Sequence, residues 1–177
     1  MTAAAANERV GAWRHVRAIA LLPFVNTVVI PGALLTLFPP APARNVADLA
    51  AAFGGTALVA CGATLVAHTV SLFVRFGKGT LAPWDPTREL VTTGAYRHSR
   101  NPMKAGLFLV LGGEALLMQS VALAAWFGGF ALVNVMYIRL HEEPRLAKRF
   151  GARYGDYCAS VPRWWPLPLL SRGSEAR

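Results

Sequence analysis

The sequence is poor in charged side chains and in residues that bind metals. Charged residues make up 15% of the 177 positions, against roughly 25% in soluble domains. Cys61 and Cys158 lie in an apolar run and a basic tail, and the four histidines are scattered. This spacing favours neither a disulfide nor a metal site, and it excludes diiron chemistry of the desaturase type. The chain is 54% hydrophobic and long enough for one domain, so it reads as a single integral membrane domain over residues 1–177.

Several sequence motifs of soluble enzymes are missing. No Gly-x-Gly-x-x-Gly follows a predicted strand, and no Gly-x-Ser-x-Gly elbow is present. The run 77–80, Gly-Lys-Gly-Thr, lacks the preceding glycine of a phosphate-binding loop. A dinucleotide fold and the soluble methyltransferase fold are therefore excluded. The chain also lacks a basic, aromatic-rich soluble surface, so no nucleic-acid partner is expected.

Long apolar runs predict an all-α membrane protein with about four transmembrane helices. The last two are joined at Gln119-Ser120 as a short helical hairpin, and a charged, amphipathic helix then leaves the membrane along its cytoplasmic surface. We expect two N-terminal spans within residues 1–80 and a catalytic half over residues 81–170. The predicted spans are residues 18–38, 49–76, 103–118 and 121–138, and the predicted amphipathic helix covers residues 139–157.

The positive charges are distributed unevenly around these spans. Lys and Arg number three before the first span, one in residues 39–48, six in residues 75–104, none in the hairpin turn and eight from Arg139 onward. Alternate sides of the membrane therefore carry 17 and 1. The positive-inside rule places both termini and the 77–102 loop on the cytoplasmic side, as expected for an inner or plasma membrane protein.

Two polar clusters on that side are candidates for a binding site. Within residues 94–103, Arg97 and Arg100 can grip a carboxylate or phosphate, and Pro102 can begin the next helix. Residues 141–143, His-Glu-Glu, can accept hydrogen bonds from ribose hydroxyls or an ammonium group. For each cluster alone, a solvated membrane interface is an equally good interpretation.

Two titratable residues lie inside the apolar runs. Glu114 falls in the predicted hairpin, where a carboxylate is costly and often functional. Packing is an equally good interpretation for Glu114, and it is the more frequent one for His68 in the second span.

The C-terminal half also carries a series of motifs in a specific order. Residues 90–106 read Leu-Val-Thr-Thr-Gly-Ala-Tyr-Arg-His-Ser-Arg-Asn-Pro-Met-Lys-Ala-Gly. Residues 142–146 read Glu-Glu-Pro-Arg-Leu, residues 150–157 read Phe-Gly-Ala-Arg-Tyr-Gly-Asp-Tyr, and residues 161–166 read Val-Pro-Arg-Trp-Trp-Pro. Over residues 88–166 this order resembles the isoprenylcysteine carboxyl methyltransferase family, which shares a superfamily with phospholipid N-methyltransferases.

The resemblance implies that S-adenosyl-L-methionine binds at the cytoplasmic membrane surface and leaves as S-adenosyl-L-homocysteine. Lys104 stands where that family usually has Tyr, and Ala95 where it usually has Pro. The cofactor-binding candidates are Tyr96, Arg97, His98, Arg100, Asn101, Pro102, Gly106, Glu142 and Glu143. The catalytic candidates, for holding an anionic acceptor or accepting a proton, are Glu114, Arg139, His141 and Arg163.

The methyl acceptor is expected to be lipid-like or apolar and to enter from the membrane lipid. An isoprenylcysteine-like carboxylate, a phospholipid amine and a thiol all satisfy this expectation. Two other functions stay open: a sterol- or enone-reducing enzyme of the wider superfamily that uses NADPH, and a non-enzymatic four-helix membrane protein. The sequence gives no indication of the oligomeric state.

Overall fold

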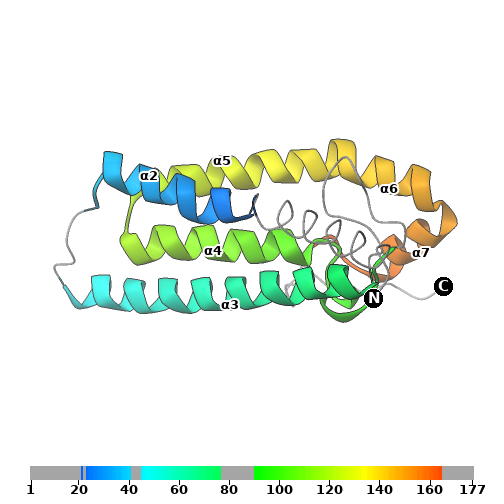
Figure 1. The fold of residues 1–177 in the computed structure, drawn as a ribbon, viewed down its shortest axis with the longest axis horizontal. Helices are drawn as coiled ribbons and strands as arrows, with labels where there is room; N and C mark the ends of the chain where they lie inside the picture. The colour runs from blue at the N-terminus through cyan, green and yellow to red at the C-terminus, as the bar shows by residue number, and fades with distance from the viewer. Residues whose placement is uncertain (1–20, 22, 41–44, 77–89, 165–177) are drawn as a thin grey trace, which may run out of the picture.

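The computed structural model describes residues 21, 23–40, 45–76 and 90–164, and every regular element in these ranges is helical. Most of them run along one long axis (Figure 1). The α-helices are α2 (Ile30–Leu37), α3 (Val46–Phe76), α4 (Pro102–Met118), α5 (Val121–Tyr137), α6 (Glu143–Phe150) and α7 (Ala152–Ser160). Two π-helical segments, η1 (Val25–Val29) and η3 (Ile138–Glu142), and the 3-10 turn η2 (Gly94–Arg97) complete the described part.

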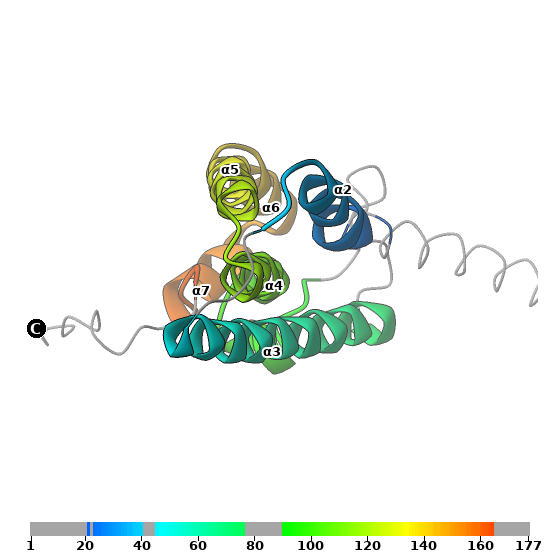
Figure 2. The same cartoon turned by 90° about the vertical axis from the view of Figure 1, so that its left-hand side faces the viewer.

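Helix α4 lies at the centre of the bundle. The end-on view shows α3 on one side of α4, with α5 and α2 on the other (Figure 2). Glycines let α3 and α4 approach closely: a Cβ on Gly62 would lie 2.6 Å from the carbonyl oxygen of Gly106, and one on Gly55 would lie 2.5 Å from the backbone nitrogen of Leu117. Small residues at such contacts are a regular feature of helix packing in membranes.

Two helices in the described part are long and apolar enough to cross a membrane. They cover Val46–Leu72 and the continuous run Val121–Phe150. Helix α4 has 17 residues, or about 26 Å, and Val25–Leu37 is a shorter apolar helix. The described parts of the four predicted spans are therefore helical, while the count of four crossings stays a prediction.

The outer faces of the helices are apolar and exposed. Large side chains such as Leu37, Phe53 and Val121 lie at the surface, whereas Leu111 and Leu123 are fully buried around the centre. Side chains on a helix face that contacts lipid lie in an apolar environment, so apolar side chains are expected on such a face. This distribution agrees with the membrane protein expected from the composition.

The charged segment after α5 differs from the predicted helix in two respects. The helix continues in line with α5 through η3 and α6, instead of turning along a surface (Figure 1). It then ends at Gly151, whose φ of +54° suits glycine better than other residues, and α7 folds back. The single helix predicted for residues 139–157 is thus wrong, because Gly151 breaks it.

The π-helical turn before Pro144 accommodates this proline within the helix. The backbone N–H of Glu143 donates to the carbonyl of Ile138, five residues earlier. Proline has no N–H of its own, so a wider turn at this point accommodates the missing bond without ending the helix. The predictions for the basic lead-in (1–17), the first half of the long loop (77–89) and the tail (165–177) lie outside the described residues.

Candidate functional site

The loop before α4 is fixed by one glycine and one buried tyrosine. Gly94 has a φ of +60°, and a Cβ there would lie 2.7 Å from the Cδ1 atom of Leu72 on α3. The η2 turn brings the ring of Tyr96 against Leu72 and Val91, and burial raises the pKa of the Tyr96 hydroxyl. The Tyr157 hydroxyl donates to the Tyr96 carbonyl at 2.7 Å. The loop is therefore anchored to both α3 and α7.

A second anchor comes from residues 161–164, which we call the C-terminal strap. The backbone N–H of Arg100 donates to a strap carbonyl at 2.9 Å. The side chains of Ser99 and Asn101 both donate to the carbonyl of Arg163, each at 3.2 Å. These bonds occupy the amide group of Asn101, so the strap and the loop form one folded unit.

Helix α4 begins where the sequence predicts. Pro102 is its first residue, and Asn101 precedes it without a capping bond from its side chain. Proline suits this position because its missing N–H would have no intrahelical partner. The N–H groups of the first turn face the loop end of the helix, where an anion is favoured.

The side chain of Glu143 joins three segments that are far apart in the sequence. Arg163 of the strap donates to both carboxylate oxygens, from Nε at 2.8 Å and from Nη2 at 2.7 Å. Arg100 of the loop donates from Nη1 at 3.1 Å. The three side chains are 17%, 29% and 15% exposed in the order Glu143, Arg163 and Arg100.

These contacts set the ionisation of the Glu143–Arg163 pair. Glu143 lies beyond the apolar part of its helix, since α6 has four charged residues among its eight. The hydrogen bonds from Arg163 lower the pKa of the Glu143 carboxyl, helped by the charge of Arg100 and opposed by burial. The same bonds raise the pKa of the Arg163 guanidinium. Both groups therefore stay charged at neutral pH.

The guanidinium of Arg100 is almost enclosed and still has an unused donor. Nη1 lies 2.9 Å from the Sγ atom of Cys158 on α7. The Nε atom is buried and has no hydrogen-bond partner within the described part of the chain. Burial raises the pKa of the neighbouring Tyr154, and it raises that of Tyr157 to about 12, so both phenols are neutral.

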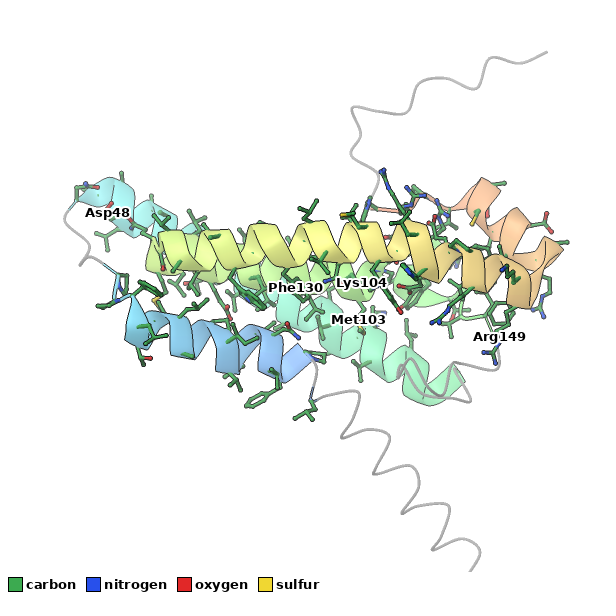
Figure 3. All side chains as sticks on the ribbon, turned by 90° about the horizontal axis from the view of Figure 1, so that it is seen from above. Asp48, Met103, Lys104, Phe130 and Arg149 are labelled. Carbon is green, nitrogen blue, oxygen red and sulfur yellow. The ribbon has the colours of Figure 1, made fainter. Side chains whose placement is uncertain are left out.

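The other glutamate, Glu142, belongs to a separate group of side chains. Its carboxylate forms an ion pair with the ammonium of Lys104, on the first turn of α4. That ammonium lies 5.2 Å from the ring centroid of Tyr137, which stacks on His141 with centroids 5.6 Å apart and an interplanar angle of 9°. Seen from above, Lys104 is labelled beside α5 (Figure 3). A cation, a carboxylate and two aromatic rings thus meet at the end of α5.

The remaining predicted residues lie outside these two groups. Gly106 packs against α3, where a Cβ would lie 2.8 Å from the Cγ2 atom of Val66. Glu114 lies ten residues after Lys104, about 15 Å further along α4, and its Oε2 atom is buried without a hydrogen-bond partner within the described ranges. Arg97, His98 and Arg139 have exposed side chains outside both groups, and His141, which is also exposed, belongs to the group of Glu142.

Sequence reasoning overlooked several members of the site. Tyr137 was not among the predicted residues, although it lies four residues before the predicted His141, the spacing that lets rings on one helix stack. Tyr157 and Cys158 lie in or next to a quoted motif, but their contacts across 58 or more positions have no local signal. The pairing of Lys104 with Glu142 required the relative placement of α4 and η3.

Two open cavities lie on other parts of the molecule. One of about 850 Å³ is at the far end, between Phe38, the α4–α5 turn and Trp126. Another of about 560 Å³ runs along α3 from Ala60 to His68, next to Leu109. Both linings are mainly apolar, and the charged side chains described above belong to neither.

Comparison with known proteins gives one finding. The model of the family described as phospholipid methyltransferase matches residues 50–153. No curated protein and no solved structure matches. The matched residues include most of α3 and all of α4, α5 and α6, and with them the loop and both glutamates. Since they make up more than half of the chain, the protein belongs to the phospholipid methyltransferase family, a family of membrane methyltransferases.

Proposed function

We propose that this protein transfers a methyl group from S-adenosyl-L-methionine to a lipid-like or apolar acceptor that enters from the bilayer. The convergence on Glu143 is the observation that carries the proposal. A loop, a helix and a strap from distant parts of the sequence meet through its carboxylate. Beside it, Glu142 is held less firmly and is more exposed. This convergence supports a binding site, because charges that only meet water at a membrane interface need no shared partner from three segments.

The side chains present fit the groups of this cofactor. Arg100 has a buried Nε donor without a partner in the described part, and a guanidinium suits a carboxylate. Glu142 can accept hydrogen bonds from an ammonium group or from ribose hydroxyls. Tyr137 and His141 offer aromatic faces next to that carboxylate. When bound, the cofactor supplies a methyl group on a positively charged sulfur, with a neutral thioether as leaving group.

The protein's contribution is mainly to position the reactants. Transfer from such a donor needs alignment more than it needs acid–base catalysis. Glu143, Arg100 and the strap hold the loop against α6, which fixes the donors around the site. We therefore propose that Arg163, expected from the sequence to hold an anionic acceptor, acts by positioning Glu143.

The acceptor is proposed to approach along the apolar faces near the end of α5. Arg139 and His141 are exposed there, one turn beyond the apolar helix, and remain candidates for holding an anionic acceptor or accepting a proton. Glu114 is a candidate for a role deeper in the bundle. A carboxylate or thiolate acceptor needs no strong base, whereas an amine or thiol must lose a proton.

We further propose four membrane crossings with the charged end on the cytoplasmic side of an inner or plasma membrane. Asp48 and Arg149 lie at opposite ends of the bundle (Figure 3). The end that holds α6 and α7 carries the basic residues Arg145, Lys148, Arg149 and Arg153, and the positive-inside rule assigns that end to the cytoplasm. Soluble cofactors are available on that side.

Ligand-induced thermal stabilisation of the purified protein tests the proposal. We expect S-adenosyl-L-methionine and S-adenosyl-L-homocysteine to raise the Tm, and NADPH to leave it unchanged. The shift should become clearly smaller in Glu142→Gln and stay unchanged in the matched control Asp156→Asn, which removes an exposed carboxylate from α7. A shift with NADPH alone would favour a reductase, and no shift with any ligand would contradict the proposal.

A further inference from the structure

The two adjacent glutamates differ in how firmly they are held. Glu143 receives three hydrogen bonds from two guanidiniums and is 17% exposed. Glu142 pairs with the ammonium of Lys104 and is 36% exposed. Glu143 is therefore committed to the architecture, whereas Glu142 can be reached from solvent.

The ammonium of Lys104 lies in surroundings that suit an organic cation. It is 18% exposed, paired with a carboxylate, and 5.2 Å from the centroid of the Tyr137 ring. Carboxylates and aromatic faces are the groups that bind ammonium and related cations in proteins. The ring of His141 stacks on that of Tyr137, with centroids 5.6 Å apart. The structure thus contains a formed cation subsite, with the protein's own lysine in it.

The walls of this subsite are fixed, but its occupant is not. Tyr137 and Glu142 project from the continuous helix of α5, η3 and α6. Lys104 reaches the subsite through a flexible four-carbon stem that ends in a single point charge. The arginines around Glu143 instead bind through forked, multiply bonded groups, so they cannot be exchanged as easily.

We propose that Lys104 is a resident counter-cation that a positively charged group of the cofactor displaces. Without ligand, the ammonium neutralises Glu142 and covers Tyr137. On binding, the ligand cation takes both contacts and the lysine moves to water. This inference rests on the proposed function and assigns the cation-binding part of that site to Glu142 and Tyr137. It also makes Lys104 a competitor that lowers the affinity for the cofactor.

Binding constants for Lys104→Gln test this exchange. The protein is reconstituted in lipid nanodiscs and titrated calorimetrically with S-adenosyl-L-methionine and S-adenosyl-L-homocysteine. We expect the variant to bind S-adenosyl-L-methionine about two- to fivefold more tightly than wild type, since a partly exposed ion pair no longer has to be broken. An equal gain for both ligands identifies their shared ammonium as the displacing group, and a larger gain for S-adenosyl-L-methionine identifies the sulfonium. Lys148→Gln, which removes an exposed ammonium from α6, should bind as wild type.

A double-variant cycle separates displacement from a general effect of charge. In a Glu142→Gln background, Lys104 and the ligand no longer compete for a carboxylate. Adding Lys104→Gln should therefore leave the affinity for the cofactor unchanged. Lys104→Arg should bind no more tightly than wild type, because the cation is retained. Weaker or unchanged binding by Lys104→Gln, with normal binding by wild type, would overturn this inference alone. Absence of binding by wild type would overturn the proposed function as well.

Discussion

Replacing Glu143 by Gln should destabilise the protein far more than the same change at Glu142. The substitution keeps the shape of the side chain but removes the charge between Arg100 and Arg163. Glu143 accepts at 2.7, 2.8 and 3.1 Å, and hydrogen bonds to charged groups contribute about 1.5–3 kcal/mol each, though not additively. Removing one partner of a largely buried ion pair costs about 3–5 kcal/mol. Because Arg163 is 29% exposed and can rehydrate, we expect a loss of about 2–4 kcal/mol.

The effect should depend on pH with a definite sign. The pKa of Glu143 is lower in the folded protein than its ordinary value of 4.5. A carboxyl with a lowered pKa stabilises the fold fully above its unfolded pKa and loses that contribution as the pH falls through the folded pKa. The difference between wild type and Glu143→Gln should therefore be constant from pH 7 to about pH 5 and shrink at lower pH.

Thermal unfolding in detergent, followed by circular dichroism, measures both effects. A loss of about 2–4 kcal/mol corresponds to a decrease of about 4–16 °C in Tm for a chain of this size. The control, Glu142→Gln, removes a 36% exposed carboxylate from one ion pair and should cost less than about 1 kcal/mol. Equal losses for the two variants would refute the different roles assigned to the glutamates. A Glu143→Gln difference that persists unchanged at pH 3 would refute the ion-pair explanation.

Two further substitutions test the packing that supports the site. Gly94→Ala should lower the stability by about 1–2 kcal/mol in the same assay, because φ is +60° and the new methyl would lie 2.7 Å from Leu72. In a Leu72→Ala background, Gly94→Ala should lose the clash but keep the strain, so a change without any cost in that background would contradict the explanation. Gly62→Ala should destabilise the α3–α4 contact by about 1–3 kcal/mol, whereas Gly128→Ala on α5, with open space around it, should stabilise by up to about 1 kcal/mol. Losses of similar size in these two glycine variants would contradict close backbone packing.

The helices were largely predictable because they depend on local patterns. Apolar runs of sufficient length, the proline at position 102 and the pair Gln119-Ser120 predict where α4 and α5 begin and end. The break at Gly151 was missed, since the apolar residues on either side keep helical spacing across it. A positive φ is only one of several backbone conformations available to glycine, and tertiary contacts select among them.

The site was predictable as a set of residue types but not as a set of pairs. The sequence indicates that Arg100, Glu142 and Glu143 matter, because charges beside apolar spans need a reason. It does not indicate which cation meets which carboxylate. Arg163 lies 20 positions from Glu143 and Lys104 lies 38 positions from Glu142, and these separations are closed by the packing of α4, η3 and the strap. The roles of the predicted residues in binding and catalysis remain predictions.

Glu142 and Glu143 have different partners because of the helical turn in which they lie. Neighbouring residues on a helix point about 100° apart, so Glu142 and Glu143 face different directions. Here Glu143 reaches Arg100 in the loop, and Glu142 reaches Lys104, the third residue of α4. The π-helical turn before Pro144 ends at these two residues, so both carboxylates lie where the helix accommodates the proline. One glutamate thus belongs to the framework, and the other lines the proposed cation subsite.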